Sequence, residues 1–145
     1  AVRVTNSPGI NFGATSVTVN NNEASEETGV FLNGNLGANF NFGDLDVTTT
    51  GDGIFLDDFS SFRTLAPTGS TINSGGSAFV ASNGGLDATF DSITSGGGSN
   101  GINLDTTTGT FTVGTNTSIT DPTVTGISVT DSDIDADFGD TVING

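Results

Sequence analysis

Residues 40–56 read FNFGDLDVTTTGDGIFL, and this stretch contains both patterns from which the fold is predicted. Phe, Leu and Val alternate with polar residues up to residue 49, and a second alternating run follows at residues 54–56. A period of two with Phe, Ile, Val and Thr is typical of β-strands, and the Gly and Asp residues between the runs are typical of tight corners. The stretch therefore predicts short strands joined by sharp turns.

The last four residues of this stretch belong to a motif that recurs along the chain. Its copies begin at residues 29, 53, 77, 101 and 126, so they lie 24, 24, 24 and 25 residues apart. A second motif with apolar residues at alternate positions recurs in nearly the same register, at residues 40, 88, 111 and 136. Two motifs that share one period indicate a repeat architecture, in which each unit buries its apolar face against the next.

We predict an all-β fold, a right-handed parallel β-helix (β-solenoid) with about 24 residues and three short strands per coil, and about five to six coils. Residues 1–145 form one domain, with an N-terminal strand or cap at 1–9, coils over 10–145 and an insertion at 20–28. The hexapeptide repeat of left-handed solenoids is missing, which favours the right-handed form. The predicted interior ladders are Val30, Ile54, Ala78, Ile102, Ile127 and Leu32, Leu56, Val80, Leu104, Val129.

The composition excludes several classes of protein. Without His or Cys, the usual ligands of zinc, haem and iron–sulfur clusters are missing, and so is a Cys nucleophile. The net charge of −15, with two Arg and no Lys, would repel nucleic acid and anionic lipid. No apolar run approaches the roughly 18 residues of a membrane span. We expect no nucleic-acid partner, no membrane insertion and no cofactor apart from the calcium considered next.

Four alternating carboxylates form the candidate metal site, at Asp131, Asp133, Asp135 and Asp137. Calcium is the ion that carboxylate oxygens suggest. However, neighbours on one face of a strand lie about 6.6 Å apart, whereas calcium takes six to eight oxygens at about 2.3–2.6 Å. A solvated, charged face that discourages sideways sheet addition is therefore the favoured interpretation.

Three aromatic residues form the candidate lateral interface, at Phe31, Phe55 and Phe79. They share the third position of the first motif, where alternation predicts that they point outward. An apolar stripe on an acidic solenoid would mark an interface. In the alternative interpretation, the insertion with Glu23, Glu26 and Glu27 or the N-terminal segment folds over them.

The two ends of the solenoid form the candidate end-to-end interface. Val2 and Val4 lie in a strand-like N-terminal segment, and Val142 and Ile143 lie in a C-terminal one, with no clear cap at either end. Unpaired strand edges invite further pairing, and a head-to-tail contact that does not close generates filaments. The alternative is that the chain is a segment of a longer solenoid.

The two motifs, F-x-F-G-x-L-x-V-T-T followed by G-x-G-I-x-L, resemble the right-handed parallel β-helix repeats of bacterial surface proteins. These include autotransporter passengers, filamentous-haemagglutinin-type adhesins and large extracellular repeat proteins. The resemblance covers most of residues 10–145. It implies an extracellular or cell-surface location of bacterial type and a structural or adhesive role.

Three functional classes follow from these patterns. The favoured one is a structural or adhesive filament subunit that binds itself head to tail, or a segment of a longer surface stalk. The second is a carbohydrate-binding adhesin module for surface glycans, and the third is a polysaccharide lyase or hydrolase. No Trp or Tyr is present as a sugar platform, and nothing in the chain would separate the pKa values of an acid and a base. We therefore assign no catalytic residue.

Overall fold

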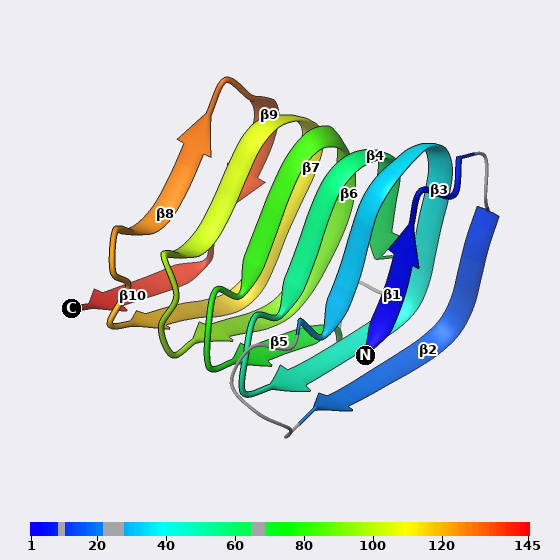
Figure 1. Cartoon of the computed structure of the whole chain (residues 1–145). Helices are drawn as coiled ribbons and strands as arrows, with labels where there is room; N and C mark the ends of the chain where they lie inside the picture. Colours follow the sequence, from blue (N-terminus) through cyan, green and yellow to red (C-terminus); the bar gives the residue numbers. More distant parts are fainter. Residues whose placement is uncertain (9–10, 22–27, 65–68) are drawn as a thin grey trace.

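The computed structural model of the chain describes residues 1–8, 11–21, 28–64 and 69–145, which contain strands and turns but no helix. The strands all belong to one sheet that winds around a central core (Figure 1). They are β1 (Val2–Thr5), β2 (Asn11–Asn21), β3 (Val30–Thr49), β4 (Ile54–Thr64), β5 (Thr71–Ser74), β6 (Phe79–Ser95), β7 (Asn100–Thr120), β8 (Thr125–Thr130), β9 (Asp133–Asp137) and β10 (Asp140–Asn144).

The strands pair in parallel, and residues from successive coils form straight ladders. One ladder has six levels: Val2, Val30, Ile54, Phe79, Ile102 and Ile127. Its members lie 28, 24, 25, 23 and 25 residues apart, so each step is one coil of roughly 24 residues. This parallel β-solenoid of about five turns confirms the predicted fold class. Figure 1 shows the coils side by side, from β1 and β2 at one end to β8, β9 and β10 at the other.

Strand pairing continues around the corners of the inner coils. As a result, β3 and β7 each run through most of a coil, whereas the C-terminal coil is divided into β8, β9 and β10. The N-terminal strand β1 pairs with β3 and so belongs to the first coil. Most of the expected insertion, at residues 22–27, lies outside the described residues, as do residues 9–10 and 65–68.

One corner repeats at every level with the same left-handed backbone. The residues there have φ between 48° and 69°. Gly, Asn and Asp adopt this conformation at low cost, and they occupy the corner in all coils but one, which has Thr. The corner residues are Asn6, Gly34, Asp58, Asn83, Thr106 and Asp131. The turns therefore repeat with the same period as the apolar ladders.

The core is a continuous row of apolar side chains along the axis, and phenyl rings join its coils. The ring of Phe79 contacts three others, with centroid distances of 6.0 Å to Phe62, 5.7 Å to Phe90 and 4.9 Å to Phe111. The ladder members Val30, Leu32, Ile54, Leu56, Ile102 and Leu104 are fully buried, as predicted.

The prediction that Phe79 points outward and Val80 inward is wrong. Phe79 is 0% exposed and lies opposite Ile54 in the ladder, while Val80 lies opposite Phe55 on the outer face. The fourth coil is thus shifted by one residue, and such a shift exchanges the two faces of a strand. The shift buries a phenyl ring among other rings, where aromatic pairs add about 0.5–1.5 kcal/mol each beyond the area that they bury.

Candidate functional site

A stack of side chains runs along the outer face of the first four coils. Arg3, Phe31, Phe55 and Val80 are consecutive members of one outward ladder. The rings of Phe31 and Phe55 are stacked, with centroids 5.1 Å apart and planes 8° from parallel. The guanidinium carbon of Arg3 lies 4.2 Å from the centroid of Phe31. This cation–π contact and the ring stack tie β1 to β3 and β3 to β4.

The stack leaves little free ring surface on this face. Phe31 has Phe55 on one side and Arg3 on the other, since β1 and β4 flank β3 in the sheet. A sugar ring that binds an aromatic residue packs on its face, and both faces of Phe31 are covered. The sequence predicted either a free apolar stripe or one covered by another part of the chain. At Phe31 the N-terminal segment provides such cover through Arg3.

The outer faces carry many carboxylates, and the ladders keep these apart. No Asp in a described ladder lies directly opposite another Asp. A donor from the adjacent coil faces the acid at several levels: Asn33 donates to Asp57 (3.0 Å), and Thr130 to Asp105 (3.0 Å). Arg63 pairs with Asp87 at 2.7 Å between the guanidinium Nε and a carboxylate oxygen. Since like charges directly opposite each other destabilise a sheet, this order lets the rod carry a charge of −15.

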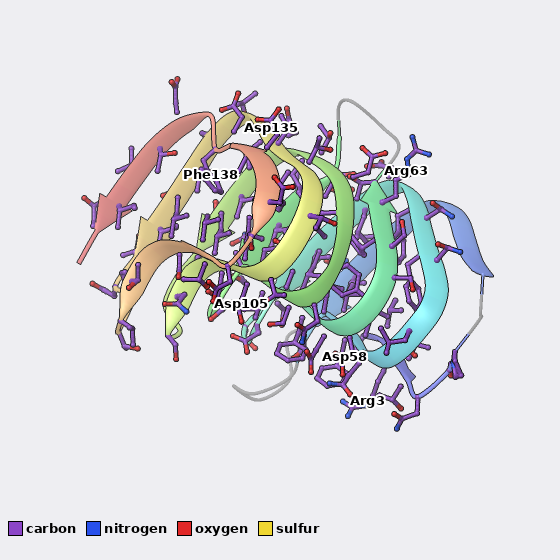
Figure 2. The ribbon with its side chains drawn as sticks, turned by 90° about the horizontal axis from the view of Figure 1, so that it is seen from above. Arg3, Asp58, Arg63, Asp105, Asp135 and Phe138 are labelled. Carbon is purple, nitrogen blue, oxygen red and sulfur yellow. The ribbon has the colours of Figure 1, made fainter. Side chains whose placement is uncertain are left out.

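Charged residues lie along opposite sides of the rod. Figure 2 shows Arg63 and Asp135 along one side, and Arg3, Asp58 and Asp105 along the other. The arrangement spreads the negative charge over the lateral surface rather than gathering it at one place.

The four acids of the predicted metal site do not all lie on one strand. Asp133, Asp135 and Asp137 are exposed on β9, but Asp131 is the corner residue before it, with φ +48°. The prediction of four carboxylates on one strand face is therefore wrong, because the chain turns at Asp131. Among the described residues, no three acidic side chains form a group that could hold a metal ion.

The C-terminal coil leaves part of the core uncovered. Within the described residues, β8, β9 and β10 pair with β7 alone, so their other edges have no strand partner. Ile143 is 49% exposed and Val129 is 45% exposed, although both stand above buried ladder residues, Ile119 and Leu104. Ile127, Ile134 and Phe138 of the same coil are partly buried against the core. This end therefore combines open backbone edges with apolar side chains.

The other end is formed by β1 and β2, which pair with β3 alone within the described residues. Val2 and Val4 stand on the inward ladders and are partly buried against the core. Of the four residues predicted for the end-to-end interface, Val2, Val4 and Ile143 thus lie on core ladders. Val142 does not: it lies opposite Ser118 on the outer side of β10 and is 54% exposed.

Two further residues of the C-terminal coil are predicted from the sequence as interior residues and not as part of the interface. Ile127 and Val129 were predicted as ladder members, and that placement is confirmed by their pairing with Ile102 and Leu104. Their place in the last coil was the signal for exposure, because a ladder member is covered on both sides only when a further coil follows.

No protein-family description, curated protein or solved structure matches the chain. Nor does any segment of the described chain form a helix with the length and apolar character of a membrane span.

Proposed function

We propose that the chain is a structural solenoid of the bacterial-surface type, an extracellular filament subunit that assembles head to tail through its ends. The observation that carries the proposal is the uncovered C-terminal coil, where core side chains such as Val129 and Ile143 stand half-exposed beside unpaired strand edges. Burying such surface stabilises an association, and the unpaired backbone groups favour a further parallel strand. A segment of a longer surface stalk is the second form of the same function, with the next coil of its own chain in place of a second copy.

Further features support a mechanical rather than a chemical role. The core is continuous along the axis, through ring contacts from Phe42 to Phe138. The lateral Asp residues are spaced by neutral residues and Arg63, as expected of a surface that stays solvated. Negative charge along the sides of such a rod would oppose sideways aggregation. Contacts between copies would then form at the ends.

The experiment that tests the proposal is electron microscopy of the purified 145-residue chain over a range of concentrations, together with sedimentation velocity. Six ladder levels per copy at about 4.8 Å per coil predict unbranched fibres with an axial repeat of about 29 Å. Short rods of monomer mass at millimolar concentration would overturn the filament proposal.

A longer chain distinguishes the stalk from the filament. If the native gene encodes further coils after residue 145, a chain that includes them should form one longer rod, with the half-exposed residues of the C-terminal coil protected in hydrogen exchange. A longer chain whose added residues do not continue the solenoid would contradict the stalk form.

A further inference from the structure

We infer that a second copy of this chain covers the C-terminal coil, with its β1 laid in parallel on β8 and its β2 on β9 and β10, in the register of the inner coils. The inference rests on the proposed filament function and specifies its junction. Here the C-terminal coil means residues 125–144, and the N-terminal coil means residues 1–8 and 11–21. The register follows by continuing the existing ladders by one step, without any new geometry.

The inward side chains match in this register. Ile127 and Val129 end two inward ladders that begin with Val2 and Val4. One further step brings Ile127 of one copy against Val2 of the second and Val129 against Val4. Aliphatic side chains then meet aliphatic side chains, and the half-exposed Val129 becomes enclosed.

The backbone corners match as well. Asp131 in the C-terminal coil and Asn6 in the N-terminal coil both turn the chain with a left-handed backbone, at φ +48° and +50°. The strands on either side therefore bend at the same level of the ladder in both coils. A second copy can pair through this corner as the inner coils do, with no change in conformation.

The charges favour this pair of surfaces over a contact between two C-terminal coils. The C-terminal coil carries five Asp and no Arg, whereas the N-terminal coil carries no acidic residue and has Arg3. In the proposed register Asp131 lies opposite Asn6 of the second copy, and Asp140 lies opposite Thr18. The junction thus follows the same pattern as the described ladders of the chain, in which no Asp lies directly opposite another Asp. A contact between two C-terminal coils would bring the five Asp of one copy close to the five Asp of the other, and these like charges would repel. We therefore expect the copies to assemble head to tail.

A charge exchange at the corner tests the register. Asn6→Asp places a carboxylate opposite Asp131 of the neighbouring copy. Within its own chain, residue 6 lies beside Gly34, which carries no charge. Like charges directly opposite each other should lower the association constant about two- to fivefold at low salt. Adding Asp131→Asn restores a neutral partner and should return the constant to that of the unaltered chain. Asp131→Asn alone replaces the Asp–Asn pair by a neutral Asn–Asn pair and should associate at least as tightly as the unaltered chain.

Sedimentation velocity in about 20 mM salt measures all four proteins, and the effect should fade near 1 M salt, where the Debye length is about 3 Å. Melting curves by circular dichroism identify variants that misfold, and Asn73→Asp, at an exposed inner position of β5 with Thr48 and Thr94 opposite it, is a control for added charge. The register is wrong if Asp131→Asn does not rescue Asn6→Asp, or if Asn6→Asp has no effect. Failure of the unaltered chain to associate would instead overturn the filament function itself.

Discussion

The ring of Phe79 packs on the ring of Phe111, with centroids 4.9 Å apart, from the ladder position that Ile54 and Ile102 hold in the adjacent coils. Phe79→Ala should therefore lower the free energy of unfolding by about 3–5 kcal/mol, because it leaves a cavity among three rings. Phe55→Ala, on the half-buried outer stack, should cost about 1–2 kcal/mol. Urea denaturation of both variants measures the difference, and equal losses would contradict the register described for the fourth coil.

Arg3 holds the first strand through its contact with Phe31. Arg3→Ala removes a cation–π interaction that contributes about 0.5–1 kcal/mol at an exposed site. The amide of Val2, which donates to the carbonyl of Gly29 at 2.8 Å, should exchange its hydrogen about two- to fivefold faster. Arg3→Lys, which keeps a cation, is the control. Unchanged exchange at Val2 would show that the contact does not hold β1 in place.

Val129 and Val142 offer a matched pair for the end contact, since both are about half-exposed Val residues of the C-terminal coil. Val129→Asp places a charge on the inward ladder and should weaken self-association at least about tenfold, because the charge would be buried at the junction. Val142→Asp adds the same charge on the outer side and should change association much less. Light scattering at equal concentrations compares the two, and equal effects would argue against stacking through the core.

Gly109 is required by the backbone at its position. It has φ +98°, and a Cβ there would collide with the carbonyl oxygen of Leu86 in the preceding coil. Gly109→Ala should lower the melting midpoint, with a loss of at least about 1–3 kcal/mol. Gly114 lies on the same strand without a positive φ, and its nearest neighbour would be 3.7 Å away, so Gly114→Ala should be neutral or stabilise by about 0.5 kcal/mol. A similar loss in both variants would contradict this assignment.

Much of the fold could be predicted because a solenoid repeats its requirements at every level. Parallel pairing places each residue beside its counterpart one coil away, so the apolar positions recur at the coil length, as at Ile54 and Ile102. The corners recur for the same reason, as at Asp58 and Asn83. Both signals are local patterns of residue type, and the amino-acid sequence displays them directly.

The candidate interfaces could be predicted less well, because they depend on which side of one strand faces inward. Phe79 and Val80 are both apolar, so alternation fits either register of the fourth coil. Contacts with rings of other coils decide in favour of Phe79, and these contacts join residues that lie far apart in the sequence. Asp131 stands at the recurring corner, and the alternation of Asp over residues 131–137 hides the turn there.

The period and the parallel stacking of strands follow from the sequence alone, because both are local patterns that every coil repeats. The shift at Phe79 and the stack of Arg3 on Phe31 were set by the tertiary structure. These features arise from packing between coils. A side chain is buried only when neighbouring coils enclose it, and that condition is set by the fold as a whole.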